Sequence, residues 1–170
     1  LDEAHSPLNH PPGNQALEAV DPQDVERLIQ AITEANRVFV VGVGRVMLSL
    51  SAFAKRLHQL GVCAHCVGDI NEPAICKSDL LLVASGSGES AIPVVIANIA
   101  KGHRARIAHI GSNPQGSVTT IADVFVRIPV TTKLGLTGEI PSQQIMTSLF
   151  EQALYILGDA IALSIALASA

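Results

Sequence analysis

The chain has 170 residues, of which 48% are apolar and only 3% aromatic, and its formal net charge is −4. This length is sufficient for one domain with a sizeable core, which the composition predicts to be aliphatic. The acidic balance argues against a nucleic-acid-binding surface. No cationic stretch followed by an apolar run opens the sequence, and three cysteines are an odd number, so we expect no secretory signal and a reducing, cytoplasmic location.

In chain order, residues 1–14 contain two histidines and three prolines without hydrophobic periodicity. We expect them to form a mobile N-terminal arm, followed by a single domain over 15–170. Asp21 and Pro22 are typical of a helix start, with an N-cap residue before proline at the first helical position. Apolar patterns then predict strands at 37–41, 62–67, 79–84, 105–110 and 124–128, and further helices at 46–60, 91–101, 113–121 and 142–168.

The predicted strands alternate with helices and read as continuous apolar runs. This pattern is typical of a parallel sheet covered on both faces. We therefore predict an α/β fold, a three-layer α/β/α sandwich around a five-stranded parallel sheet. Ligands of such sheets bind beyond the carboxyl ends of the strands, where the turns at 42–45 and 85–90 follow two predicted strands.

Residues 85–90 read Ser-Gly-Ser-Gly-Glu-Ser and are called the Ser/Gly turn below. Backbone N–H groups at this position, between a strand and a helix, favour an anion. The glycines would let the backbone approach a phosphate, and the hydroxyls of Ser85, Ser87 and Ser90 would hydrogen-bond to it. The alternative is a flexible connection without a ligand. No lysine follows the glycines, which excludes the nucleotide P-loop.

Cys63 and Cys66 form a C-x-x-C pattern inside the predicted strand 62–67. Residues three positions apart in a strand point to opposite faces. We therefore expect no shared metal ion and interpret both residues as buried, unpaired thiols.

The C-terminal segment 153–168 is strongly apolar and is interrupted by Asp159. It is shorter than the roughly 20 apolar residues that a membrane span needs. A helix that is apolar on nearly every side is instead buried in a core or an oligomer interface, so we expect no membrane association.

A series of motifs between residues 20 and 165 resembles the sugar-isomerase (SIS) domain family, and within it the 6-phospho-3-hexuloisomerases. The motifs are Phe39-x-x-Gly42-Val43-Gly44-Arg45, Ala52–Leu57, Leu60-Gly61, Val67-Gly68-Asp69, Pro73-Ala74-Ile75, the Ser/Gly turn, Ala122-Asp123, Ser142-Gln143 and Leu149-Phe150-Glu151-Gln152.

This resemblance implies a flavodoxin-like sheet of five parallel strands, a homotetramer, and isomerisation of 3-hexulose 6-phosphate to fructose 6-phosphate without cofactor or metal. By position it assigns Glu151 to proton transfer. It assigns substrate binding, of the phosphate or the sugar, to Gly44, Arg45, Ser85, Gly86, Ser87, Gly88, Ser90, Ser142 and Gln143.

Moving a carbonyl along a sugar requires a base beside the reacting carbons. Glu151 fits by residue type, early on an apolar helix; its alternative role is a helix-dipole partner or an interface salt bridge. Arg45 is expected either to bind sugar hydroxyls and a developing oxyanion or to form an intersubunit ion pair. His58 is the second catalytic candidate, although such a histidine is more typical of a surface or an interface.

Two other classes of protein compete with the enzyme. SIS domains also occur as phosphosugar sensors in transcription regulators, usually beside a helix-turn-helix domain, and a regulatory subunit without activity is a third reading. The short arm before residue 15 and the presence of Glu151 favour the enzyme.

Overall fold

The structure is a computed structural model that describes residues 11–168. In chain order its elements are α1 (Pro11–Glu18), α2 (Pro22–Glu34), β1 (Val38–Val41), α3 (Arg45–Gln59), β2 (Ala64–Cys66), β3 (Leu80–Ala84), α4 (Ala91–Gly102), β4 (Arg106–Gly111), the 3₁₀ helix η2 (Thr119–Ile121), β5 (Val124–Arg127) and α5 (Ser148–Ala168).

The five strands form one parallel sheet in the order β2-β1-β3-β4-β5. β1 and β3 are buried along their whole length, as expected for inner strands of a covered sheet. The predicted five-stranded parallel sheet is therefore confirmed, and its strand order is the flavodoxin-like one.

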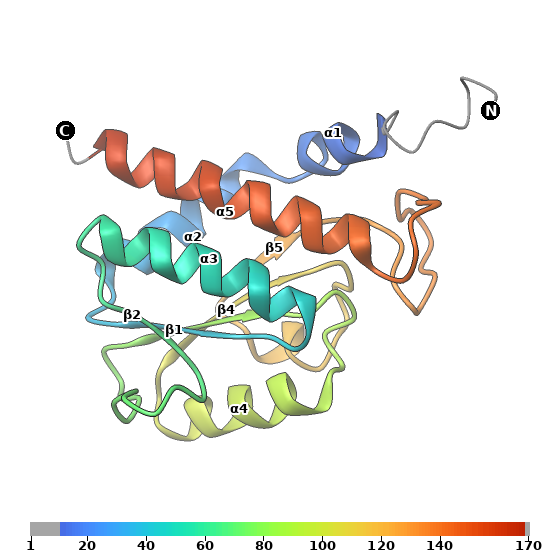
Figure 1. Cartoon of the computed structure of the whole chain (residues 1–170). Helices are drawn as coiled ribbons and strands as arrows, with labels where there is room; N and C mark the ends of the chain where they lie inside the picture. The colour runs from blue at the N-terminus through green and yellow to red at the C-terminus, as the bar shows by residue number, and fades with distance from the viewer. Residues whose placement is uncertain (1–10, 169–170) are drawn as a thin grey trace.

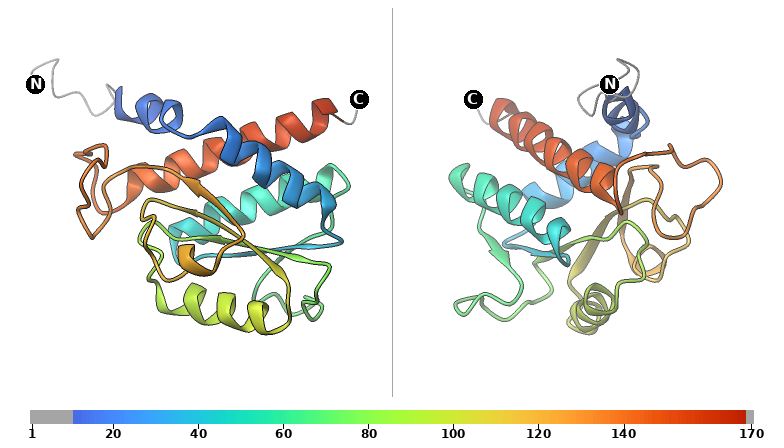
Figure 2. Two further views of the ribbon diagram at one scale, coloured as in Figure 1. Left: turned by 180° about the vertical axis from the view of Figure 1, so that it is seen from behind. Right: turned by 45° about the vertical axis from the view of Figure 1, so that its right-hand side comes forward.

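The helices cover the two faces of the sheet unequally. α2, α3 and α5 lie on one face, with α1 packed outside against α5, while α4 covers the other face (Figures 1 and 2). Side chains alternate along β1, so that Val38 and Val40 enter the core of the thicker helical layer and Phe39 and Val41 enter the core beneath α4. The predicted three-layer sandwich is confirmed.

The start of α2 follows the sequence prediction. The side chain of Asp21 accepts a hydrogen bond from the Gln23 N–H at 2.8 Å, and Pro22 occupies the first helical turn. The predicted boundary after residue 14 is wrong, because α1 runs through it from Pro11 to Glu18. α1 packs against α5 and fully buries Ala16. Residues 1–10 of the predicted arm lie outside the described residues.

The last helix begins at Ser148 and not near Ser142, so the segment 128–147 between β5 and α5 is a long loop, called the β5–α5 loop below. α5 has 21 residues, and by length and composition it is the one described helix that could cross a membrane. The expectation that it is too short was therefore wrong. Half of its most apolar window is buried inside this fold, where the helix packs against α1, α2 and α3.

The two cysteines of the C-x-x-C pattern differ from the expectation. Cys63 precedes β2 and is exposed, with its Sγ 3.4 Å from His65 Nε2, whereas Cys66 is partly buried. The prediction of two buried thiols is therefore wrong. Within residues 11–168, no group of three or more His, Cys, Asp or Glu side chains is arranged to hold a metal ion.

Candidate active site

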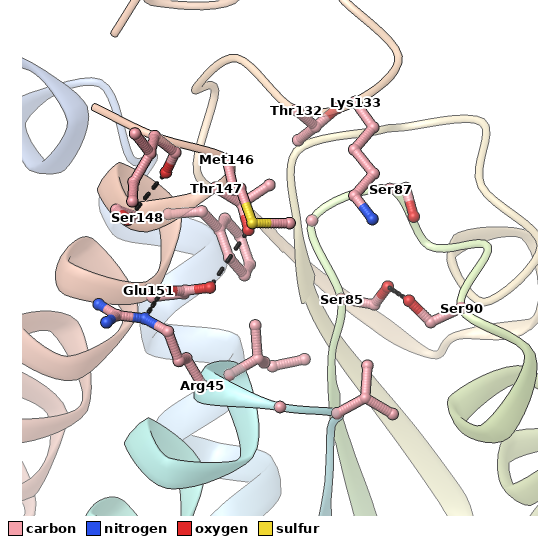
Figure 3. Close-up of a pocket in the computed structure, with 17 residues that line it drawn as sticks. Arg45, Ser85, Ser87, Ser90, Thr132, Lys133, Met146, Thr147, Ser148 and Glu151 are labelled. Carbon is pink, nitrogen blue, oxygen red and sulfur yellow. Dashed lines mark hydrogen bonds and ion pairs between the residues drawn. The ribbon is translucent and has the colours of Figure 1, made fainter. Parts of the chain in front are cut away.

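A cavity of about 380 Å³ lies where the strand order reverses. The chain leaves β1 toward β2 on one side and returns to β3 on the other side of β1. Ligands of open α/β sheets bind at this point, beyond the carboxyl ends of the strands. The turn after β1, the Ser/Gly turn, the β5–α5 loop and the start of α5 line the cavity, with side chains that include Arg45, Ser85, Ser87, Ser90, Thr132, Lys133, Met146, Thr147 and Glu151 (Figure 3).

The Ser/Gly turn is shaped by hydrogen bonds among its own residues. Ser85 Oγ accepts from the Gly88 N–H and donates to Ser90 Oγ, both at 3.2 Å. Ser87 Oγ accepts from the Glu89 N–H at 3.2 Å. The hydroxyl protons of Ser87 and Ser90 have no acceptor among the described residues, and neither do the backbone N–H groups of these two residues. Ser85 therefore orients the turn, and Ser87 and Ser90 leave donors free at the cavity.

Ser90 is also the N-cap of α4, yet its side chain makes no capping hydrogen bond to the helix. The first N–H groups of α4 therefore carry their partial positive charge at the cavity edge, where an anion is stabilised. This arrangement is the one that the Ser/Gly composition predicts.

His109 on β4 supports the turn from the core. It is fully buried. Its Nε2 lies 3.0 Å from the carbonyl oxygen of Ser85, and its Nδ1 lies 2.9 Å from Thr119 Oγ1. A side chain at Gly111 is excluded, because its Cβ would lie 2.5 Å from His109 Cε1. Burial lowers the pKa of His109 to about 4, although the hydrogen bond to Ser85 acts in the opposite direction.

The segment after β4 fixes the other side of the turn. Asn113 Nδ2 donates to the Ser87 carbonyl at 3.1 Å. The Glu89 carboxylate accepts from the Ser117 hydroxyl and N–H, both at 2.7 Å, and these bonds lower the pKa of Glu89. Glu89 is therefore held by Ser117 and does not line the cavity.

Glu151 lies in the first turn of α5, on the side of the cavity opposite the serines (Figure 3). Its side chain is 12% exposed, and its carboxylate pairs with Arg45 Nε, while Thr147 Oγ1 donates to the other carboxylate oxygen at 3.2 Å. Ser49 on α3 donates to the Glu151 carbonyl at 3.0 Å. The ion pair of Arg45 therefore forms within one chain, unlike the intersubunit pair expected as one alternative, and joins the start of α3 to the start of α5.

The cavity brings together most of the residues predicted for the site. Those that line it are Gly44, Arg45, Ser85, Gly86, Ser87, Ser90 and Glu151. Gly88 does not line it: this glycine has a φ of +70° and packs behind the turn, where a Cβ would lie 3.1 Å from Gly116 Cα. The role of Gly88 is therefore to shape the turn.

Three predicted site residues lie elsewhere. Ser142 and Gln143 precede α5 in the β5–α5 loop, and neither lines the cavity; Ser142 Oγ instead accepts from the Gln144 N–H at 3.1 Å. His58 is exposed in the last turn of α3. It lies thirteen residues beyond Arg45, which is about 20 Å along a helix, so it is not a catalytic residue of this cavity within one chain.

Sequence reasoning missed the part of the cavity that the β5–α5 loop provides, namely Thr132, Lys133 and residues 145–147. The loop has no hydrophobic periodicity, and its one recognised motif, Ser142-Gln143, does not line the cavity. One signal was present: the loop leaves the carboxyl end of β5, which lies at the same edge of a parallel sheet as the Ser/Gly turn.

No family model matches the chain. It is 43% identical over 142 residues to a 3-hexulose-6-phosphate isomerase of Mycobacterium gastri, covering 84% of this chain and 71% of that protein. It is 34% identical over 143 residues to a protein of the same name from Bacillus subtilis, covering 84% and 77%. A hypothetical protein of Methanococcus jannaschii, whose crystal structure was used to infer a 3-hexulose-6-phosphate isomerase function, superposes with a TM-score of 0.77 at 29% identity, covering 86% and 78%.

The sheet order and the cavity between the Ser/Gly turn and a helical carboxylate, taken with these similarities, define the class as a sugar-phosphate isomerase domain. The extent of the sequence identity then shows that the chain belongs to the 3-hexulose-6-phosphate isomerase family.

Proposed function

We propose that this protein interconverts 3-hexulose 6-phosphate and fructose 6-phosphate through an enediol intermediate. The observation that carries the proposal is the position of Glu151 across one cavity from Ser87 and Ser90 (Figure 3). In these sugars the phosphate is on C6, whereas the reaction takes place at C2 and C3. A phosphate held at the Ser/Gly turn directs the reacting carbons toward Glu151.

At the Ser/Gly turn, the end of the cavity that holds the phosphate in this proposal, the hydrogen-bond donors are neutral. The hydroxyls and N–H groups of Ser87 and Ser90 bind the phosphate oxygens, and the start of α4 contributes its dipole. Gly86 lines the cavity and allows the backbone to approach the ligand. Ser85 holds the Ser90 hydroxyl in place.

The other end transfers the proton. The Glu151 carboxylate removes the proton from C2 of the 3-hexulose and returns it to C3, while the proton of the C2 hydroxyl is lost and the former C3 carbonyl oxygen gains one. The net result is a carbonyl at C2. Arg45 stabilises the negative charge that develops on these oxygens, and Thr147 fixes the orientation of the carboxylate.

A coupled assay tests this function. The protein is incubated with 3-hexulose 6-phosphate, and the fructose 6-phosphate formed is measured by enzymes that convert it onward and reduce NADP. We expect turnover that depends on protein concentration. Tight binding of a phosphosugar without turnover would contradict the enzyme and support the sensor.

We further infer a homotetramer. Tyr155, Ile156, Leu163 and Leu167 on α5 are exposed at 49–70%, and Leu48 on α3 at 69%. A second cavity of about 320 Å³ shares Arg45 and Glu151 and is also lined by Leu48 and Tyr155. An apolar surface beside the ion pair supports an interface that completes the site.

Light scattering at micromolar concentration tests the assembly. We expect a mass four times that of the chain, and Leu163→Glu should lower it, whereas a monomeric mass of the wild-type protein would contradict the tetramer. A cytoplasmic location is part of the same proposal, and the three cysteines, all free, support it.

A further inference from the structure

Two cationic side chains line the cavity, Arg45 and Lys133. Arg45 is already paired with Glu151. The ammonium group of Lys133 forms no hydrogen bond or ion pair with any residue in the described range 11–168. Figure 3 shows this group directed toward Ser87 and away from Glu151. An uncompensated positive charge therefore faces the Ser/Gly turn.

The backbone around Lys133 is held by a single carboxylate. Glu139 accepts hydrogen bonds from the Thr132 N–H at 3.3 Å and from the Leu136 N–H at 2.9 Å. Thr132 is buried, and its Oγ1 accepts from the Leu134 N–H at 3.3 Å. The main chain on both sides of Lys133 is thus anchored, while its side chain remains exposed and free to adjust to a ligand.

The same carboxylate connects this segment to the Ser/Gly turn. Ser112 Oγ lies 2.8 Å from Glu139 Oε1, and the Ser112 N–H donates to the Gly86 carbonyl at 2.9 Å. Thr132 also packs directly on the turn, because a Cβ at Gly86 would lie 3.1 Å from Thr132 Cγ2. These contacts fix the distance between the base of the Lys133 side chain and the turn.

We propose that Lys133 binds the phosphate of the substrate from the side opposite Ser87 and Ser90. The inference rests on the proposed function and extends it. A sugar phosphate carries between one and two negative charges near neutral pH, whereas the turn supplies only dipoles. The net charge of −4 provides no general attraction for an anion. A charge-assisted hydrogen bond from Lys133 supplies the missing charge where the phosphate binds.

Three variants test this role. Lys133→Met retains the length of the side chain without the charge, and Lys133→Arg retains the charge. The matched control is Lys77→Met, which removes the same charge from an exposed residue that precedes β3, at the opposite edge of the sheet. The affinities for fructose 6-phosphate and for inorganic phosphate are measured by calorimetry, and thermal unfolding checks the fold.

We expect Lys133→Met to weaken the binding of both ligands by about 10- to 100-fold, the effect of losing one hydrogen bond between charged groups. Lys133→Arg should restore most of the affinity, and Lys77→Met should bind like the wild type. In the coupled assay, KM should rise for Lys133→Met while kcat changes little, because the phosphate contact is equal in the ground and transition states.

Equal affinity of Lys133→Met and wild type for both ligands would overturn the role of Lys133 and leave the proposed function standing. Weaker binding of fructose 6-phosphate with unchanged binding of inorganic phosphate would also overturn it, because Lys133 would then contact the sugar. A wild-type protein that binds neither ligand would overturn both the function and this inference.

Discussion

The Nε2 atom of His109 lies 3.0 Å from the carbonyl oxygen of Ser85, so one buried side chain joins β4 to the Ser/Gly turn. Gly111 makes this contact possible, since a Cβ there would also lie 2.7 Å from the Ser85 oxygen. The conformation of the turn therefore depends on a histidine that contributes no atom to the cavity.

This contact predicts a loss of stability in acid. Burial lowers the pKa of His109 from 6.5 to about 4, so between these values the unfolded chain binds a proton that the folded chain excludes. The stabilisation is complete above about pH 6.5 and is lost as the pH falls toward 4, by about 2–3 kcal/mol at about pH 4.5.

Urea unfolding of the wild type and of His109→Leu, each at neutral pH and at about pH 4.5, measures this effect. The variant should lose less stability between the two pH values than the wild type. The same loss in both proteins would show that other groups cause the acid sensitivity.

The hydroxyls of Ser87 and Ser85 should have different roles, the first in binding and the second in stability. Ser87→Ala should weaken fructose 6-phosphate binding by roughly 1.5–3 kcal/mol, because a hydrogen bond to a charged group is lost, and should leave thermal stability nearly unchanged. Ser85→Ala should instead lower the thermal midpoint, because it removes a buried hydroxyl that bonds both the Gly88 N–H and Ser90 Oγ and leaves the Gly88 N–H only the Ser85 carbonyl as acceptor. Calorimetry and thermal unfolding of both variants make the comparison. Equal binding by Ser87→Ala and wild type would exclude the Ser/Gly turn as the phosphate site.

Arg45→Met should lower turnover more than substrate affinity, because the guanidinium acts on charge that develops in the transition state. Its side chain is 65% exposed, so the ion pair with Glu151 contributes at most about 1 kcal/mol to stability, and the variant should fold normally. Steady-state kinetics beside thermal unfolding separates the two effects. A large fall in the thermal midpoint with unchanged kcat would make Arg45 a structural residue.

The strands were predictable to within about two residues, because short continuous apolar runs bounded by turn residues, such as Leu80–Ala84, are typical of strands in a covered sheet. α1 was missed because two prolines and a glycine open it and only Ala16 and Leu17 in it are apolar, too few to show a helical period. The start of α5 was placed too early because no glycine or proline lies between Ser142 and Ser148. In the structure the helix cannot begin earlier because Met146 has a φ of +55°, a left-handed conformation that methionine rarely adopts.

The parts of the site that lie in a local sequence motif were predictable. The Ser/Gly composition predicted a turn with free donors, the resemblance to a family predicted Glu151, and both line the same cavity. The side of the cavity formed by the β5–α5 loop could not be predicted, because long-range contacts place it. Lys133 faces the Ser/Gly turn because Glu139 and Ser112 connect this loop to the end of β4. Likewise, the exclusion of His58 depends on which end of α3 faces the cavity.

The most direct test of the central claim, that Glu151 transfers the proton, is the turnover of Glu151→Gln on 3-hexulose 6-phosphate, measured together with its affinity for fructose 6-phosphate. The amide retains the shape of the side chain but cannot accept the proton. We expect turnover to fall by about 10²–10⁴-fold, the usual contribution of a general base, with little change in affinity because the phosphate contacts lie across the cavity. Near-normal turnover of Glu151→Gln would contradict the account.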